Sequence, residues 1–129
     1  MADEGSAFAR ALSGKDRSAL LEVLADDVDF RALTPGRAWE ASTSAEVADI
    51  LFGSWFEPQD DIVGLVDVVD GEPVEDTRRV AYRVAVRTPD GDFTVEQQAY
   101  YRTEEGRIAH LRVLCSGFRE SGGIPDVDE

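Results

Sequence analysis

Three strand-like runs in the second half of the chain constrain its fold most strongly. They cover Arg79–Thr88, Phe93–Arg102 and Arg107–Phe118, and all three are rich in β-branched and aromatic residues. Two turn segments separate them, Pro89-Asp90-Gly91-Asp92 and Thr103-Glu104-Glu105-Gly106. Glycine adopts the positive φ that short hairpin turns need. The runs therefore predict a long antiparallel meander, paired in sequence order, which we interpret as the wall of a ligand pocket.

The first half of the chain predicts three helices and two further strands. Apolar residues recur at helical spacing before Gly14 and again after Asp16, which suits a helix N-cap. Thr43 and Glu46 match a capping box, in which Glu46 reaches back to the cap's own amide. Trp39 lies in a stretch that could add a short strand. The predicted helices span 4–13, 16–24 and a segment that begins at Thr43, and the predicted strands are 28–32 and 62–69.

This order of elements predicts an α+β domain. The expected architecture is a cone-shaped, curved antiparallel sheet wrapped around three helices from the N-terminal half of the chain. Such a sheet leaves a cavity at its wide end. A length of 129 residues predicts one domain, which we place at 1–119. The segment 120–129 is acidic and contains Gly122, Gly123 and Pro125, so we expect a flexible tail.

The charge balance limits the classes of partner. The chain has 27 acidic and 13 basic residues, a formal net charge of −14. Such a field repels phosphate backbones and anionic lipids, so we expect neither nucleic acid nor membrane as a partner. A single cysteine, no signal peptide and no apolar run of about 20 residues predict a cytoplasmic protein. One histidine and one cysteine without metal-ligand spacing predict no metal site, and we expect no cofactor.

The elements, in this order, resemble the nuclear transport factor 2-like superfamily, which includes ketosteroid isomerase and the SnoaL-like polyketide cyclases. The resemblance spans Ser6 to Phe118. It is carried by the helix pair, the phrase Leu24–Phe30 and the hairpin Glu104–Ile108. The resemblance implies a cone-shaped fold with a hydrophobic pocket and, in most members, a dimer. It does not imply one function, because members catalyse several different reactions or none.

The resemblance also indicates chemistry that this chain lacks. The isomerase's general-base aspartate falls at Ala32, its oxyanion-hole tyrosine near Phe8 and its protonated aspartate at Gln98. The acid or histidine of the cyclases falls at Leu111 and Val113. None of these residues can take up a proton, although Gln98 can still donate a hydrogen bond. We therefore expect neither steroid isomerisation nor the acid–base pair of the cyclases.

Candidate catalytic residues come from the middle strand of the meander. Strand alternation places Glu96, Gln98 and Tyr100 on one face, and a two-residue turn would set Arg83 opposite Gln98 and diagonal to Glu96. The register of the family turns this face inward, beside Leu111, Val113 and Cys115. Glu96 would then be a base, Gln98 and Tyr100 hydrogen-bond donors, and Arg83 the charge partner. The alternative is an external face on which Arg83 and Glu96 form an ordinary surface pair.

A second set of residues forms the predicted ligand-binding wall. Its members are mostly apolar, and the aromatic ones are expected to close the wide end of the cone. For Trp39 and Trp55, core packing is an equal alternative, and inert packing is the alternative for Cys115. We expect His110 on the surface or in an interface, because strand parity separates it from Leu111. The predicted set is Phe30, Ala32, Trp39, Trp55, Arg83, Leu111, Val113 and Cys115.

Three functions remain open at this point. The first is a cofactor-independent cyclase, isomerase or dehydratase acting on a small hydrophobic molecule. The second is a module that binds such a molecule without chemistry, and the third is a dimerisation domain. We also expect a homodimer through the convex face of the sheet, because an apolar patch there would otherwise be exposed. The patch consists of Val84, Val86, Val95 and Ile108.

Overall fold

The computed structural model describes residues 4–120. The helices are α1 (Glu4–Ser13), α2 (Arg17–Val23), α3 (Ser44–Ile50) and the π-helix η1 (Leu51–Trp55). The strands are β1 (Leu24–Thr34), β2 (Arg37–Ala41), β3 (Asp61–Asp70), β4 (Arg78–Thr88), β5 (Gly91–Glu104), β6 (Arg107–Cys115) and β7 (Arg119–Glu120). Of the predicted flexible tail, only Glu120 is described, as part of β7, and the rest lies outside the described residues.

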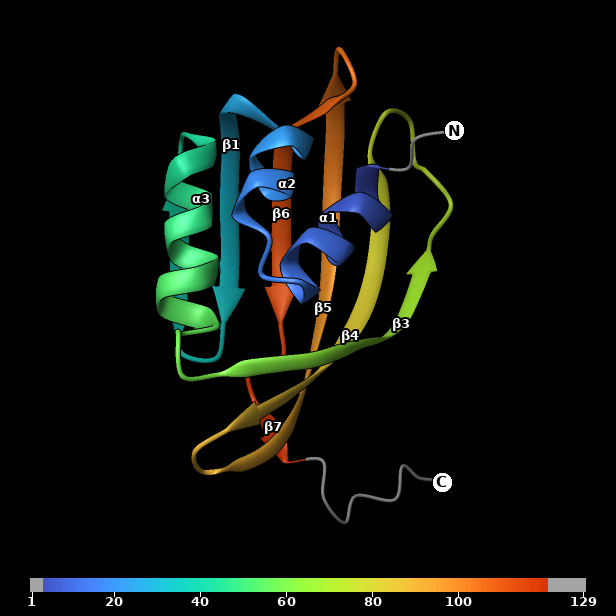
Figure 1. The fold of residues 1–129 in the computed structure, drawn as a ribbon. Coiled ribbons are helices and arrows are strands. Elements are labelled where there is room, and N and C mark those ends of the chain that lie inside the picture. The colour runs from blue at the N-terminus through green and yellow to red at the C-terminus, as the bar shows by residue number, and fades with distance from the viewer. Residues whose placement is uncertain (1–3, 121–129) are drawn as a thin grey trace.

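The strands form one sheet in the order β2-β1-β6-β5-β4-β3, with β7 paired to β5. β4, β5 and β6 are antiparallel neighbours, which confirms the predicted meander. β1 and β6 run parallel, so the sheet is mixed rather than wholly antiparallel. This pairing is possible because the long connection between these two strands returns the chain to the same end of the sheet. Figure 1 shows the helices over one face of the curved sheet, which is the predicted α+β, cone-like architecture.

The predicted helix starts are correct in position. Asp16 caps α2 by accepting a hydrogen bond from the amide of Ala19 at 3.0 Å. Thr43 caps α3 by accepting one from the amide of Glu46 at 3.2 Å. The Glu46 carboxylate reaches one residue further back than predicted, to the amide of Ser42 at 2.9 Å. The hydrogen bonds from Ser42 lower the pKa of Glu46, because they favour its charged form.

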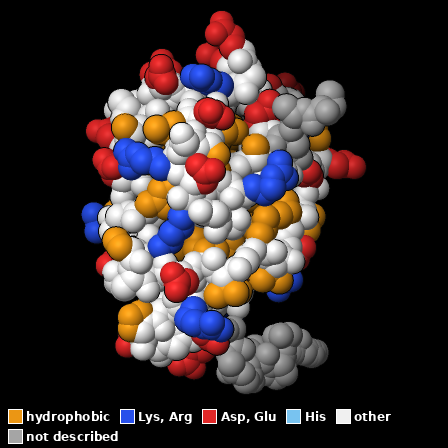
Figure 2. Space-filling model, viewed as in Figure 1, with side chains coloured by type: hydrophobic (Ala, Val, Ile, Leu, Met, Phe, Trp, Pro, Cys, Tyr) orange, Lys and Arg blue, Asp and Glu red, His pale blue; other side chains and the backbone are white. Residues whose placement is uncertain are grey.

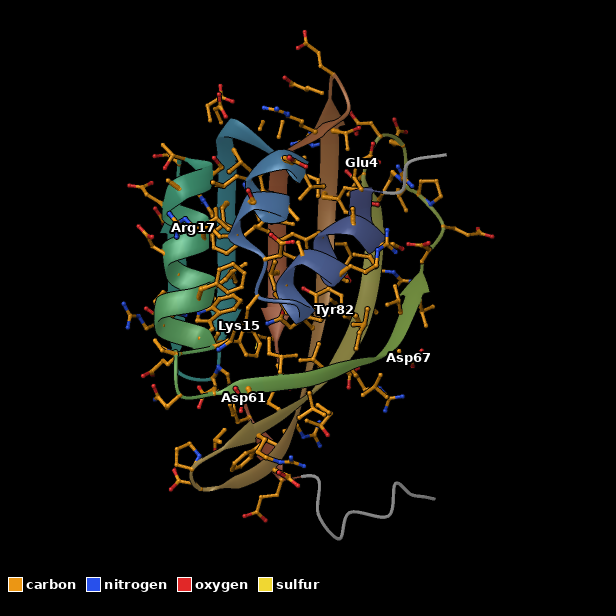
Figure 3. All side chains as sticks on the ribbon, in the orientation of Figure 1. Glu4, Lys15, Arg17, Asp61, Asp67 and Tyr82 are labelled. Carbon is orange, nitrogen blue, oxygen red and sulfur yellow. The ribbon has the colours of Figure 1, made fainter. Side chains whose placement is uncertain are left out.

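Lys15 ties the helical hairpin to the segment that follows η1. It occupies the turn between α1 and α2 with a φ of 50°, a left-handed conformation unusual for a residue with a side chain. Its Nζ donates to the backbone carbonyl of Glu57 at 2.7 Å and to that of Asp60. Figure 3 shows Lys15 near the start of β3. The end of η1 is thereby held against the helical hairpin.

The core lies between the helices and the inner face of the sheet. Val84, Val86, Val95 and Ile108 are all at most 1% exposed and belong to this core. The predicted convex apolar patch is therefore wrong, since these side chains face inward. The homodimer itself stays a prediction.

A β-bulge between β5 and β6 decides which side chains face inward. Thr103 pairs with Ile108, and a regular hairpin would continue by pairing Gln98 with Val113. The register shifts next to this pair, so Ala99 faces Val113 instead. A one-residue shift moves every later side chain to the other face of the strand. The bulge thus inverts the faces of β5 relative to the apolar residues of β6.

The edge strand β3 carries the apolar surface seen in Figure 2. Val63, Val66 and Val69 are each more than half exposed, and the register of β3 on β4 shifts twice along this stretch. Such irregularities discourage further strand pairing at a sheet edge. No helix among residues 4–120 is long and apolar enough to cross a membrane.

Candidate functional site

A cavity of about 180 Å³ lies at the end of the sheet where β1 and β6 finish. Five chain segments contribute to it: the end of β1, β2, η1 with the next residue, β5, and the stretch from Cys115 to Phe118. The lining residues are Thr34, Trp39, Ser54, Trp55, Phe56, Val95, Cys115, Gly117 and Phe118. Both tryptophans of the chain are among them. The cavity is therefore mainly aromatic, with two hydroxyls and one thiol.

The π-helix places Trp55 in the cavity wall. The amide of Phe56 donates to the carbonyl of Leu51 at 2.8 Å, five residues earlier, which is the hydrogen bond of a π-turn. This wider turn changes the direction of the side chains that follow α3, and such turns are frequent at functional sites. Trp55 is 8% exposed, and its ring packs 6.0 Å from that of Trp39 and 6.3 Å from that of Phe30.

The two indole N–H groups have different environments. Nε1 of Trp39 donates to Oγ1 of Thr34 at 2.8 Å, and the guanidinium of Arg37 lies 3.7 Å from the centroid of the Trp39 ring. Nε1 of Trp55 is buried and has no hydrogen-bond partner among the described residues. A buried donor without an acceptor costs about 1–3 kcal/mol. The indole N–H of Trp55 is thus an unsatisfied buried donor in a residue that lines the cavity.

A buried polar chain leads from the core to the cavity. The hydroxyl of Tyr82 donates to Oε1 of Gln97 at 2.5 Å, and Nε2 of Gln97 donates to Sγ of Cys115 at 3.3 Å. The amide of Gly117 also donates to this sulfur, at 3.4 Å. Burial raises the pKa of Tyr82 well above its ordinary value, and the nearby Cys115 raises it further. Figure 3 shows Tyr82 between α1 and the sheet.

The segment after β6 closes one side of the cavity. Gly117 has a φ of +77°, and a Cβ there would lie 2.8 Å from Cγ of Pro35. Only glycine suits this close approach of the segment to the turn after β1. The ring of Phe118 then packs 5.9 Å from that of Phe56 and 5.7 Å from that of Phe93. An aromatic cluster thus continues from the cavity wall onto β5.

The predicted catalytic residues lie on the other face of the sheet. Arg83, Glu96, Gln98 and Tyr100 do share a face, as predicted, but it is the outer one. Glu96 is exposed and pairs across the sheet with Arg83, whereas Gln98 was the expected partner. Arg83 forms its ion pair with Asp67 at 3.0 Å. The inward orientation is wrong because the bulge between β5 and β6 inverts the faces, and Gln97 takes the inner position that was predicted for its neighbours.

The predicted ligand-binding residues divide into three groups. Trp39, Trp55 and Cys115 line the cavity together. Arg83 is excluded, because it lies on the outer face. The other members are buried on the inner face beside the cavity, where β1 pairs with β6, and they are Phe30, Ala32, Leu111 and Val113.

His110, the one histidine of the chain, is not among the residues that line this cavity. His110 pairs with Asp29 and Arg102 on the outer face, and burial and then the neighbouring arginines lower its pKa. Residues 4–120 contain no cluster of three or more His, Cys, Asp or Glu side chains that could hold a metal ion. The described lining contains no carboxylate, imidazole, ammonium or guanidinium group.

Sequence reasoning missed Gln97 and Tyr82. Both lie on the face of their strand that was predicted to point outward, and the observed register buries them in the core. A polar side chain in an otherwise apolar alternating row is the signal that could have found Gln97, since Val95, Ala99 and the buried Tyr101 flank it at strand spacing.

Comparison with solved structures places the fold among known proteins. An LEH-like epoxide hydrolase from M. tuberculosis is 15% identical, with a TM-score of 0.62 over 88% of this chain and 80% of that one. A candidate polyketide cyclase from Silicibacter sp. TM1040 is 14% identical, with a TM-score of 0.70 over 88% and 87%. A candidate isomerase from Bacillus subtilis is 12% identical, with a TM-score of 0.70 over 88% and 86%. At such identities the likeness shows the fold alone.

Among curated proteins, none matches the chain significantly. The SnoaL-like domain family matches residues 6–111, which include most of α1, all of α2 and α3, and the strands up to the middle of β6. With the curved mixed sheet and its covering helices, this match shows that the chain belongs to the SnoaL-like domain family and has the nuclear transport factor 2-like fold.

Proposed function

We propose that this protein binds a small, mostly apolar molecule in the cavity lined by its two tryptophans. The observation that carries the proposal is the lining itself, which combines four aromatic side chains with few polar groups. Apolar walls with a small number of placed polar groups are typical of small-molecule sites. An apolar cavity of about 150 Å³ can hold benzene. The 180 Å³ cavity therefore suits one ring with a short substituent.

Binding is a better explanation of this lining than acid–base catalysis. Cyclisation, isomerisation and dehydration move protons, and they need an acid or base within hydrogen-bond reach of the substrate. The described lining has no carboxylate, imidazole or ammonium group. The neighbouring structures named as epoxide hydrolase, cyclase and isomerase share the fold, and a shared fold does not transfer a reaction.

Toluene is a suitable first probe, because it matches the cavity in size and carries no polar group. The two tryptophans give two indole N–H signals in a ¹H–¹⁵N spectrum, and both indoles line the cavity. We expect toluene to shift both signals saturably and to raise the thermal midpoint, because a ligand that binds only the folded state stabilises it.

A matched pair of variants in η1 tests the location. Ser54→Phe places a ring at the cavity wall and should abolish the toluene response. Gly53→Ala, one residue earlier, adds a methyl with nothing within 4 Å and should leave the response unchanged. If toluene moves neither indole signal in the native protein, the binding proposal fails and the cavity is packing space within a dimerisation module.

A further inference from the structure

We propose that the outer face of the sheet carries a docking surface for an acidic, extended segment of another protein. The surface is an arginine cluster, which consists of Arg31 on β1, Arg112 on β6 and Arg102 on β5. It lies on the side of the sheet away from the helices (Figure 1) and shares no residue with the cavity. The inference is therefore independent of the binding function proposed above.

The strand register brings the three arginines together. Arg31 and Arg112 are direct partners in the parallel pairing of β1 with β6. Phe30, which precedes Arg31, is buried in the core, so this pair of arginines points outward. Arg102 pairs with His110, two residues before Arg112, and therefore lies diagonal to Arg112. Neighbouring strands are about 4.8 Å apart, so long side chains at these positions can reach one common partner.

The cluster has few carboxylates near it, although the chain has 27 acidic and 13 basic residues. Arg112 is paired with Oδ1 of Asp29 at 3.3 Å. Glu40 lies opposite Arg31 on β2 but forms no ion pair with it. Within the part of the chain that the structure describes, Arg31 and Arg102 form neither a hydrogen bond nor an ion pair. Two guanidinium groups, with five N–H donors each, are therefore available to the carboxylates of a partner.

His110 senses the positive charge of this cluster. It lies between Asp29 and Arg102 in the cross-strand pairing. Burial is the first cause that lowers its pKa, and the three arginines lower it further, whereas Asp29 raises it. Like charges nearby disfavour a proton on the imidazole. All three arginines thus act on one point of the outer face.

An acidic extended segment fits the chemistry and shape of this surface. The guanidinium group binds carboxylates through paired hydrogen bonds, which the ammonium group of lysine cannot form. Every second side chain of an extended segment lies on the same side, about 6.7 Å apart. This spacing is close to that of the arginines along and across the sheet. Because the formal net charge of −14 repels such a segment elsewhere, binding should be confined to the cluster.

A capped peptide of alternating glutamate and serine tests the inference, and the same peptide with glutamine is its neutral control. The chain has one histidine, so the ring protons of His110 give a single reporter in a ¹H spectrum. We expect the glutamate peptide to shift these signals saturably and the glutamine peptide to leave them unchanged. The glutamate peptide should also raise the pKa of His110, because bound carboxylates offset the charge of the arginines.

Three variants locate the binding. Arg31→Gln and Arg102→Gln each remove one unpaired guanidinium and should each weaken the glutamate peptide roughly 2–5-fold, the usual value of one exposed ion pair. The double variant should weaken it by about the product of the two factors. Arg10→Gln makes the same change in net charge at an exposed position of α1, on the other side of the sheet, and should leave the affinity unchanged.

The outcomes separate the acidic segment from other occupants. No shift with the glutamate peptide, or an equal shift with the glutamine peptide, would overturn the inference. The same shift and pKa change with sodium sulfate at equal ionic strength would mean that any anion suffices, and would also overturn it. A loss of affinity in Arg10→Gln as large as in Arg31→Gln would assign the effect to net charge alone and contradict the proposed location.

Light scattering distinguishes the remaining occupant, a second copy of this chain. The native protein and the double variant Arg31→Gln/Arg102→Gln should have the same mass in solution. A different mass would mean that a second copy covers the arginine cluster, and the acidic segment would then be the wrong partner. The toluene response of the cavity should be the same in both proteins, so this result and the test of the binding function can be judged separately.

Discussion

The buried hydrogen bond between Tyr82 and Gln97 allows a quantitative test of the core. Tyr82 is 2% exposed and Gln97 is 1% exposed, and the bond between them is 2.5 Å long. Tyr82→Phe removes only the hydroxyl, since the edge-to-face contact with Phe8 at 6.2 Å needs only the ring. Gln97→Met keeps an unbranched side chain of similar length and removes both polar groups.

Each single change leaves one buried polar group without its partner. We expect Tyr82→Phe to lower the free energy of unfolding by about 1–3 kcal/mol, because Oε1 of Gln97 loses its donor. Gln97→Met should cost a similar amount, because the Tyr82 hydroxyl loses its acceptor. The double variant should cost less than the sum by about 1–2 kcal/mol, since replacing both partners leaves no unsatisfied group.

Urea denaturation followed by far-UV circular dichroism measures all four proteins. For 129 residues, an unfolding entropy of about 270 cal/mol/K makes each kcal/mol worth about 4 °C in thermal midpoint, which gives a second readout. The slopes against urea should stay equal, which shows that the unfolded states are alike. Single effects that add to within about 0.5 kcal/mol would refute the reasoning, because partners in one hydrogen bond do not act independently.

Three further outcomes are expected. Gly5→Ala should lower the free energy of unfolding by about 1–3 kcal/mol, because its Cβ would lie 2.6 Å from the Tyr101 hydroxyl. Gly53→Ala is the control, because its Cβ would have nothing within 4 Å, and equal melting temperatures of the two variants would contradict the expectation. The pKa of Glu46 is lowered in the folded protein, so the charged carboxylate stabilises the fold. The native protein should therefore melt at a higher temperature than Glu46→Gln above pH 4.5, and this difference should disappear as the pH falls through the folded pKa. A difference in melting temperature that does not change with pH would count against this expectation. Light scattering at micromolar concentration should give about twice the mass of one chain, and the mass of a single chain would exclude the homodimer.

Local signals in the sequence were sufficient for the elements and their order. Asp16 and Thr43 cap the helices that were predicted to start there. The two turn segments delimit β4, β5 and β6 to within a few residues, except that the last run ends at Cys115 and resumes as β7. These signals are local because capping and turn geometry depend on neighbouring residues alone.

The orientation of β5 could not be predicted in the same way. The row of β5 with Val95, Ala99 and Tyr101 is the more apolar one and favours the core side, whereas the register of the family favoured the row with Glu96 and Gln98. The shift next to Thr103 and Ile108 decides which row meets the core. A bulge depends on packing around the whole hairpin and carries no fixed sequence signal here, because the residues at the shift itself, 102–103 and 108–110, include neither glycine nor proline. For this reason the row of β5 predicted to face the core was the one next to the row that does face it.

The parallel pairing of β1 with β6 also governs how this protein folds. Phe30 lies beside Leu111, so the centre of the sheet joins a strand near the beginning of the chain to one near its end. Closing so long a loop costs entropy that local hairpins avoid. The meander of β4, β5 and β6 can form early from neighbouring residues, whereas β1 must wait for β6 to be synthesised. On the ribosome, β1 can pair with β2 as soon as both have emerged, but its edge toward β6 stays unpaired until most of the chain has been synthesised.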